Sequence, residues 1–336
     1  MREPSYWWEK PGLVSRLLWP AGFVYGAIAA RRMRRPGHSA GIPVICVGNF
    51  TLGGTGKTPT VMSLVRWLAG AGETPFVLTR GYGGREAGPL RVDLKTHDAR
   101  HVGDEPLLLA RHAPVIVAHD RAAGAALAAD AGATIIVMDD GLQNPSLRKD
   151  VSLAVVDGRR GLGNASVFPA GPLRAPLRTQ LARVDAILAV GAGAGVAQIA
   201  AIAREHGRPL FRARLEPQAR VVKDIGRKKV LAFAGIGDPE KFFSTLAAAG
   251  IEAMAEESFP DHHVYTQTDA ERLLARADAG KLIPLTTEKD MARLAGGEGA
   301  LATLRARARD LPVTLVIEDE EALRNLIRTR CKAARA

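Results

Sequence analysis

Cysteine, aromatic residues and long apolar runs are all scarce in this sequence, and each shortage excludes something. Among the 336 residues are two cysteines, four tyrosines and nine phenylalanines. Cys46 lies in an apolar run and Cys331 in a basic tail, so a disulfide framework is implausible and a reducing compartment fits. No zinc spacing or aromatic stacking motif accompanies the basic residues, so the sequence does not favour a nucleic-acid-binding protein.

One extended apolar stretch lies near the N-terminus, at 17–30, where the sequence is LLWPAGFVYGAIAA. It is shorter than the roughly 20 residues that cross a bilayer as a helix. Trp7, Trp8 and Lys10 precede it and the basic run RRMRR follows at 31–35, an order unlike that of a secretory signal. Two interpretations fit equally: a helix in the membrane interface with its arginines near anionic lipid, or an amphipathic helix packed on its own protein.

The composition otherwise describes an ordinary folded protein, with 47% apolar and 24% charged residues. The length exceeds the roughly 100–200 residues of a single domain, so we expect two domains. No internal repeat and no long low-complexity segment is present. The formal net charge of +11 favours an acidic partner, such as phosphate groups, nucleic acid or an anionic membrane surface.

Short β-branched runs alternate with helix-like segments from residue 41 onward, which is typical of a parallel sheet covered by helices. The first set has predicted strands at 42–48, 75–80, 114–118, 134–140, 152–158 and 185–190, and helices at 57–71, 104–112 and 120–131. The second set has predicted strands at 228–238, 281–290 and 312–319, and a helix at 239–249. The predicted fold is α/β: a P-loop NTPase-like parallel sheet domain with a second, smaller α/β lobe.

These two sets divide the chain into three regions. We expect an N-terminal membrane-interface helix region at 1–40, a P-loop domain at 41–215 and a smaller C-terminal α/β lobe at 216–336. The segment that joins the domain to the lobe lies at roughly 206–228.

The strand at 42–48 leads into a glycine-rich turn, with the sequence VICVGNFTLGGTGKTPTV at 44–61. Gly56, Lys57 and Thr58 match the second half of the Walker A pattern, whereas Thr51 takes the place of its first glycine. The backbone N–H groups of such a turn bind phosphate, as does the positive end of the following helix. We predict that Lys57 reaches the β- and γ-phosphates and that Thr58 binds Mg²⁺, with a purely structural glycine turn as the alternative. The predicted nucleotide-binding residues are Thr51, Leu52, Gly53, Gly54, Thr55, Gly56, Lys57 and Thr58.

A P-loop also requires an acidic residue at the end of a neighbouring strand, where it holds the metal ion. Asp139 and Asp140 follow the apolar residues 135–138 and are the candidates. We favour Asp139, with Asp140 as its neighbour or substitute. A strand-ending turn stabilised by Asp and Gly is the structural alternative.

Seven short motifs occur in a fixed order between residues 48 and 290: GNFTLGGTGKTP, RGYGG, GDEP, DDGLQ, FPAGPLR, FPDHH and TTEKD. With them the chain resembles the tetraacyldisaccharide 4′-kinase family, the lipid A 4′-kinases of Gram-negative bacteria. The family's P-loop has the same run before its Gly-Gly-x-Gly-Lys-Thr, so the missing first glycine is a family variant. The N-terminal apolar and basic segment also matches the family's membrane association.

This resemblance implies a kinase that uses ATP and Mg²⁺ in lipid A biosynthesis. Such a kinase transfers the γ-phosphoryl group of ATP to the 4′-hydroxyl of an acylated glucosamine disaccharide 1-phosphate, the tetraacyldisaccharide 1-phosphate. The implied location is the cytoplasmic face of the inner membrane, peripheral or monotopic on an anionic membrane surface, with no nucleic acid as partner. The positive net charge then has targets in substrate phosphate, nucleotide and lipid together.

The family match also implies a catalytic set of Lys57, Asp104 and His262. Asp104 in GDEP matches the family's proposed base, which accepts the proton of the sugar hydroxyl during in-line transfer. From the residues alone, an Asp before Glu-Pro is equally a helix N-cap. His262 matches the histidine that partners this carboxylate, so the second lobe would close on the first, although His263 beside it leaves the choice ambiguous.

Further contacts are predicted around this set. Glu105 is a candidate for the metal, and Gln143 for the phosphates or the waters of the metal. The candidate phosphate contacts are Arg80, Arg121 and Arg174, because a guanidinium fork matches phosphate oxygens. The sequence departs from the family at Ala175, which follows Arg174 where an acid is usual. The task of that acid would fall to Asp139, Asp140 or Glu105, or be lost.

Two other classes of function stay open at this point. A P-loop GTPase or ATPase switch acting on a protein partner would also use the loop, and TEKD at 287–290 superficially resembles a guanine-reading motif. The other class is a basic membrane or nucleic-acid-binding module with a vestigial P-loop. ATP consumption that depends on an acylated disaccharide acceptor would separate the kinase from both.

Overall fold

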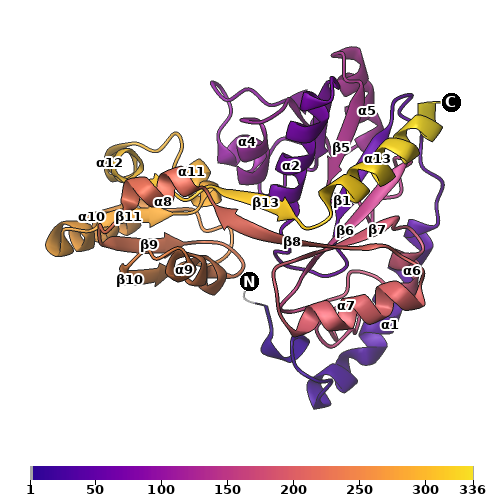
Figure 1. Cartoon of the computed structure of the whole chain (residues 1–336), viewed down its shortest axis with the longest axis horizontal. Coiled ribbons are helices and arrows are strands. Elements are labelled where there is room, and N and C mark those ends of the chain that lie inside the picture. The colour runs from indigo at the N-terminus through magenta and orange to yellow at the C-terminus, as the bar shows by residue number, and fades with distance from the viewer. Residues whose placement is uncertain (1–2, 336) are drawn as a thin grey trace.

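A computed structural model describes residues 3–335 of the chain (Figure 1). Its strands form two sheets, each with helices of its own, and the smaller unit lies beside the larger one. The predicted α/β fold, with a large and mostly parallel sheet and a smaller second sheet, is confirmed. Residues 1–2 of the predicted N-terminal region and residue 336 of the predicted C-terminal lobe lie outside the described residues.

The large sheet has nine strands within residues 3–335. In spatial order they are β13 (Val313–Ile317), β8 (Leu210–Pro217), β7 (Ala186–Val190), β6 (Val151–Asp157), β1 (Val44–Gly48), β5 (Ile135–Asp139), β2 (Pro75–Thr79), β4 (Val115–Val117) and β3 (Leu90–Arg91). The interior pairs are parallel, and the edge strands β13 and β3 run antiparallel to their neighbours. Strands buried on both faces are continuously apolar, which is why all six strands predicted in the first set correspond to strands here.

Helices cover both faces of the large sheet. One face carries α2 (Lys57–Gly70), α3 (Ala99–Val102), α4 (Asp104–Leu109) and α13 (Glu320–Arg335). The other face carries α5 (Arg121–Asp130), α6 (Leu177–Leu181) and α7 (Ala194–Glu205). The carboxyl ends of β1 and β5 therefore open between α2 and the loops that follow β5, at the edge where ligands bind in such sheets.

The small sheet is parallel and has the order β10 (Ala253–Ser258), β9 (Val230–Ala234), β11 (Ile283–Thr286) and β12 (Arg309–Asp310). Its helices are α8 (Ala219–Ile225), α9 (Pro239–Ala248), α10 (Gln267–Gly280), α11 (Glu288–Arg293) and α12 (Gly299–Arg307). Apolar side chains on its two faces form two cores of their own. We call this unit the small lobe, and the large sheet with its helices the large lobe.

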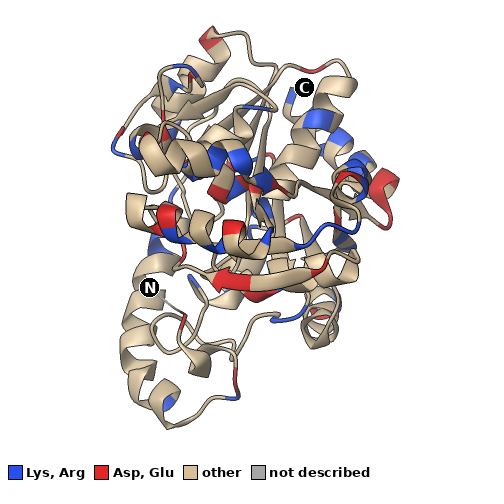
Figure 2. Cartoon of the chain, turned by 90° about the vertical axis from the view of Figure 1, so that its left-hand side faces the viewer, with Lys and Arg blue, Asp and Glu red and all other residues tan. Residues whose placement is uncertain are grey.

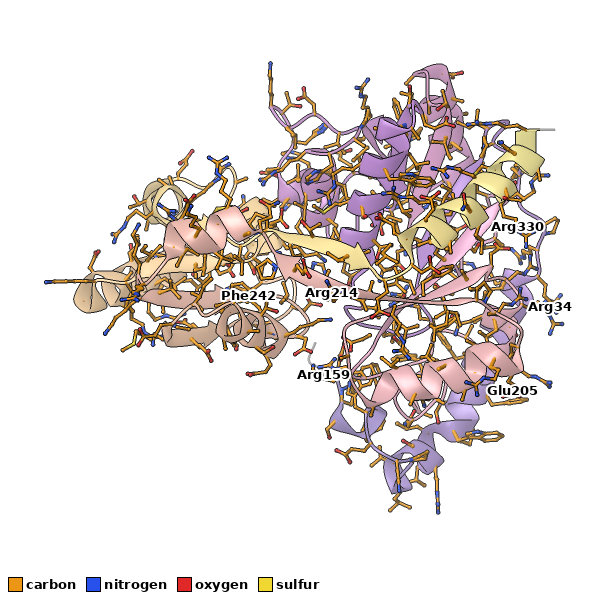
Figure 3. All side chains as sticks on the ribbon, viewed as in Figure 1. Arg34, Arg159, Glu205, Arg214, Phe242 and Arg330 are labelled. Atoms are coloured by element: carbon orange, nitrogen blue, oxygen red, sulfur yellow. The ribbon has the colours of Figure 1, made fainter. Side chains whose placement is uncertain are left out.

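One strand that the sequence assigns to the small lobe belongs to the large sheet instead. The sequence predicts 312–319 as part of the small lobe, yet β13 pairs antiparallel with β8, with Leu315 opposite Leu215. α13 then packs Leu323 and Ile327 into the core of the large lobe, and Figure 3 shows Arg330 of α13 on that side of the molecule. Local patterning does not specify which sheet a strand enters, and β8 itself, which alternates buried and exposed residues, is missed by the sequence. The boundaries at 40/41 and 215/216 stay a prediction.

The N-terminal helix is longer than its apolar stretch. α1 (Leu13–Met33) follows the short 3₁₀ helix η1 (Ser5–Trp7), and within the described residues it is the one helix long and apolar enough to cross a membrane by length and composition. Gly22 and Gly26 pack on the segment 167–176, where a Cβ atom on Gly22 would lie 2.8 Å from the carbonyl oxygen of Val167. Its other face exposes large apolar side chains: Leu13, Leu17, Trp19, Phe23, Val24 and Ile28. Figure 2 shows few charged residues along this helix.

The placement of α13 generates a stability prediction. Ile327 is 1% exposed in the core of the large lobe, so Ile327→Ala removes buried methyl groups and leaves a cavity. We expect a loss of about 2–5 kcal/mol in the free energy of unfolding, measured by urea denaturation of the full-length chain. Thr329→Ala, at an exposed position of the same helix, is the matched control. Equal stability of the two variants would contradict the assignment of α13 to the large core.

Candidate active site

The glycine-rich turn occupies residues 49–56, between the end of β1 at Gly48 and the start of α2 at Lys57. Gly53 and Gly56 have φ values of +96° and +98°, a left-handed conformation that glycine adopts at little cost. The loop is braced from one side, because the N–H of Leu52 donates to the carbonyl of Pro172 at 2.8 Å. Its backbone and the first turn of α2 thus form a preorganised site for an anion.

Lys57, Asp140 and Arg174 form a charged cluster at this loop. Lys57 Nζ lies 3.7 Å from Asp140 Oδ1. Arg174 Nη1 donates to both oxygens of Asp140, at 3.0 and 3.1 Å, and Arg174 Nε donates to the carbonyl of Thr51 at 2.9 Å. Burial acts in the opposite direction, yet Lys57 and Arg174 together lower the pKa of Asp140 to about 2. Asp140 is therefore a carboxylate already paired with two cations.

Asp139 has a different environment, although it is the next residue. It ends β5, stands opposite Val47 of β1 and is 2% exposed. Burial, together with the charges of Glu105 and Asp140, raises the pKa of Asp139 to about 7. Its Oδ1 is buried without a hydrogen-bond partner in the described chain. A buried, unpartnered carboxylate oxygen beside a phosphate-binding loop fits a cation at this position.

The described residues contain no group of three His, Cys, Asp or Glu side chains that could hold a metal ion unaided. A Mg²⁺ ion is usually bound by one or two carboxylates together with substrate phosphates and waters. Glu105 is the second carboxylate within reach, since Thr58 Oγ1 lies 3.5 Å from its Oε1. Asp139, Glu105 and Thr58 are thus the residues that fit such an ion.

Asp104 begins α4 and is 4% exposed. His262 of the small lobe lies with Nδ1 3.3 Å from Asp104 Oδ1, and Arg293, also of the small lobe, donates from Nε to Oδ2 at 2.7 Å. Although burial opposes it, the hydrogen bond from His262 and the charge of Arg293 hold the pKa of Asp104 below its usual range. The same hydrogen bond raises the pKa of His262. His263 instead contacts Asp269, at 3.0 Å, so it is His262 that faces Asp104.

The remaining predicted contacts lie in three different environments. Gln143 donates to the carbonyl of Asn49 and to Gln180, both at 2.7 Å, so it braces the base of the loop. Arg121 is 2% exposed and donates to the carbonyl of Ala118, and burial lowers the pKa of its guanidinium to about 10. Arg80 is exposed directly after β2. Among the predicted arginines, Arg174 is thus the one that the structure ties directly to the loop and to an acid.

Sequence reasoning missed two cations of the small lobe. Lys289 Nζ lies 2.5 Å from Glu105 Oε1, and Arg293 pairs with Asp104. Both lie on α11, within and just after the TEKD motif. Asp290 of that motif is fully buried and accepts from the N–H of Gly235 and the hydroxyl of Tyr265, so it has no freedom to bind a guanine. The spacing of Lys and Arg by one helical turn after a strand is the signal that could have identified the pair.

Comparison with known proteins decides the family. Residues 14–332 match the family described as tetraacyldisaccharide-1-P 4′-kinase. The chain belongs to the tetraacyldisaccharide 4′-kinase family. It is 52% identical to the tetraacyldisaccharide 4′-kinase of Bradyrhizobium sp. (strain ORS 278) over 336 residues, covering all of both chains. It is 54% identical to that of Nitrobacter winogradskyi over 327 residues, covering 97% of each.

A solved structure also resembles this chain. The crystal structure of LpxK from Aquifex aeolicus in complex with ATP matches it with a TM-score of 0.73 and 27% identity, covering 95% of this chain and 99% of that chain. The predicted family, the fold and the function as a kinase of lipid A biosynthesis are therefore confirmed. The alternative of a P-loop switch acting on a protein partner is not needed to explain any motif.

The raised pKa of Asp139 generates a prediction about stability and pH. Between pH about 4 and about 7 the folded protein retains a proton that the unfolded chain releases, so in this window the contribution of Asp139 to stability falls as pH rises. Without metal or nucleotide, Asp139→Asn should raise the Tm at pH 8 by roughly 2–4 °C and change it little at pH 4. Calorimetry in EDTA measures this difference, and a lower Tm of the variant at pH 8 would contradict it.

Proposed function

We propose that this chain transfers the γ-phosphoryl group of ATP to the 4′-hydroxyl of tetraacyldisaccharide 1-phosphate, with residues 51–58 holding the nucleotide. One observation carries the assignment of the site: Asp104 and Glu105 are adjacent, and they face the partner histidine and the phosphate-binding loop respectively. A base for the acceptor hydroxyl and a cradle for the donor phosphates therefore share one site. The ATP held by the Aquifex aeolicus relative supports the choice of nucleotide.

In this proposal Asp104 accepts the proton of the 4′-hydroxyl as the oxygen attacks the γ-phosphorus in line. Its low pKa keeps it ionised at neutral pH, ready to accept a hydrogen bond from the hydroxyl. His262 orients the carboxylate from the small lobe. Lys57 and Arg174 supply positive charge beside the transferred group, where positioning and electrostatic stabilisation do most of the catalytic work.

Mg²⁺ would be held by Asp139, Thr58 and Glu105, and when bound it neutralises charge on the β- and γ-phosphates. Asp139 is preferred to Asp140 because Asp140 already accepts two hydrogen bonds from Arg174, whereas Asp139 has a buried oxygen without a partner. Ala175 is fully buried, so the acid usual at this position is replaced by a side chain that reaches no ligand. The metal contacts proposed here do not require that acid.

α1 would attach the enzyme to the cytoplasmic face of the inner membrane. Its exposed apolar side chains have the character of a surface that enters the acyl region, and its last turn and the residues after it carry exposed arginines at 31, 32, 34 and 35. The packing of Gly22 and Gly26 against the large lobe favours a helix that lies in the interface while it stays on the protein. An acceptor with four acyl chains would then be reached without leaving the membrane.

The transfer reaction itself is the first test. Radiolabelled γ-phosphate should pass from ATP with Mg²⁺ to tetraacyldisaccharide 1-phosphate in detergent micelles, and Lys57→Ala and Asp104→Asn should each lower kcat by about 10²–10⁴-fold. Asp104→Asn should leave ATP binding unchanged, as measured by calorimetry, because Asp104 faces the acceptor. No product from the wild-type chain, with ATP still hydrolysed, would refute the proposed function.

Membrane attachment is tested by flotation with liposomes. Leu17→Glu and Phe23→Glu place charges on the exposed apolar face of α1, and each should reduce co-flotation with phosphatidylglycerol-containing vesicles by about tenfold. Met254→Glu, on an exposed strand position of the small lobe, is the matched control and should float as the wild type does. Retained flotation of both α1 variants would show that this face does not touch the membrane.

A further inference from the structure

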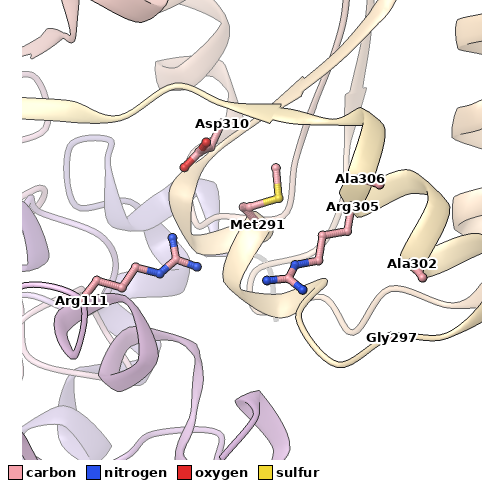
Figure 4. A pocket seen from close by; sticks show the side chains of 7 residues that line it. All are labelled: Arg111, Met291, Gly297, Ala302, Arg305, Ala306 and Asp310. Carbon is pink, nitrogen blue, oxygen red and sulfur yellow. The ribbon is translucent and has the colours of Figure 1, made fainter. Parts of the chain in front are cut away.

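The two cations of α11 face the two acids of α4 across the boundary between the lobes. Lys289 pairs with Glu105, and Arg293, one helical turn later, pairs with Asp104. The other side of α11 holds Met291, which lines a cavity of about 450 Å³ between Arg111 of the large lobe and Arg305 of the small lobe (Figure 4). α11 thus contacts the proposed base from the small lobe, beside the loop that carries His262.

Arg293 is the more deeply placed of the two cations, with 6% of its side chain exposed. Its Nε donates to Asp104 Oδ2 at 2.7 Å, and its Nη1 donates to Asp290 Oδ1 at 2.7 Å and to the carbonyl of Gly235 at 2.5 Å. One guanidinium thus binds three acceptors from three segments. A rigid fork with several donors can do this, whereas a single ammonium group cannot bind the same acceptors in a fixed geometry.

The carbonyl of Gly235 links Arg293 to the histidine. It also accepts the backbone N–H of His262, at 3.1 Å. His262 has a φ of +56°, a left-handed conformation that is unusual for a residue other than glycine, so this backbone needs to be held by its surroundings. Arg293 therefore contacts both the carboxylate of Asp104 and the peptide group that fixes His262.

The guanidinium of Arg293 is itself held in place by Asp290. Asp290, which accepts from it, is fully buried and also accepts from the N–H of Gly235, from Tyr265 at 3.0 Å and from Thr287 at 2.7 Å. A Cβ atom on Gly235 would lie 3.3 Å from Arg293 Nη1 and 3.1 Å from Asp290 Oδ1, so the turn is closely packed as well. The guanidinium is preorganised before any substrate binds.

We propose that Arg293 is a positioning residue for phosphoryl transfer. It holds the carboxylate of Asp104 and the loop that carries His262 in a fixed relative position when the lobes are in contact. The inference rests on the proposed role of Asp104 as base. Arg293 acts through these two residues and contributes to the chemical step, while nucleotide binding depends on the loop at residues 51–58.

The test is a double-mutant cycle on the full-length chain, with γ-phosphoryl transfer as the activity. Arg293→Gln should lower kcat by about 100-fold at saturating ATP and acceptor and change the KM for ATP by less than about threefold. Arg293→Lys keeps the charge but donates from a single nitrogen atom, so it should regain about tenfold of the loss. In an Asp104→Asn background, Arg293→Gln should lower kcat by less than about a further threefold, because the group that Arg293 positions is no longer a base.

A matched control separates positioning from simple docking of the lobes. Arg159 lies at the junction of the lobes (Figure 3) and pairs with Asp238 of the small lobe, but it contacts neither Asp104 nor His262. Arg159→Gln should therefore keep kcat within about threefold of the wild type. Thermal unfolding of each variant, followed by circular dichroism, identifies any that fail to fold. If Arg293→Gln does not fold, the double-mutant cycle is measured with Arg293→Lys instead.

The outcomes distinguish this inference from the proposed function. An equal loss from the change at Arg293 in both backgrounds, or an equal loss from Arg159→Gln, would overturn the positioning role while the activity and its base stand. Wild-type activity in Arg293→Gln would also overturn it. Failure of the proposed function would give a different result: the wild-type chain would show no transfer, or Asp104→Asn would retain the transfer activity. In either case the inference about Arg293 would also be refuted.

Discussion

The neutralisation of four carboxylates around one phosphate-binding loop is the constraint on which this structure depends. Asp104, Glu105, Asp139 and Asp140 lie at the carboxyl edge of the large sheet or on the helix beside it, and burial makes every uncompensated charge there costly. Three of the four have cation partners. Asp139 forms no ion pair within residues 3–335, and it is the one whose pKa is raised. The site is thus compensated everywhere except at the position that fits a metal ion.

The compensating cations come from three separate parts of the chain. Lys57 starts α2, Arg174 lies in the segment that braces the loop, and Lys289 and Arg293 come from the small lobe. Separation of the lobes would therefore remove Arg293 and His262 from Asp104, and Lys289 from Glu105. Electrostatics and the proposed catalytic pairing of Asp104 with His262 favour the same arrangement of the lobes. The surplus of positive charge in the composition therefore stabilises buried carboxylates, besides any attraction to phosphate and lipid.

Whether the sequence could predict an interaction depends on how far apart its partners lie along the chain. The loop at residues 49–56 and the two acids at the end of β5 depend on neighbours in the chain, so local motifs identify them. The pairing of Asp104 with His262 depends on a contact between lobes, and family resemblance rather than pattern points to it. Arg293 is missed because its spacing from Lys289 places both cations on one face of a helix but does not show that this face meets the large lobe. The prediction that the strand at 312–319 belongs to the small lobe is wrong for a related reason, since the sequence of an apolar strand does not specify which strand it pairs with.

The pairing of β8 with β13 has a consequence for how the protein can change. Pro217 and Val313 are register partners, so the chain leaves the large sheet and returns to it at neighbouring positions. The small lobe is in this sense an insertion whose two ends meet, attached through a two-stranded ribbon. The residues at the end of this ribbon are where a hinge between the lobes would lie, because a few element-terminal residues absorb the φ/ψ changes of a domain closure. Residues within the insertion can also vary in number without disturbing the sheet, provided that the two ends still meet.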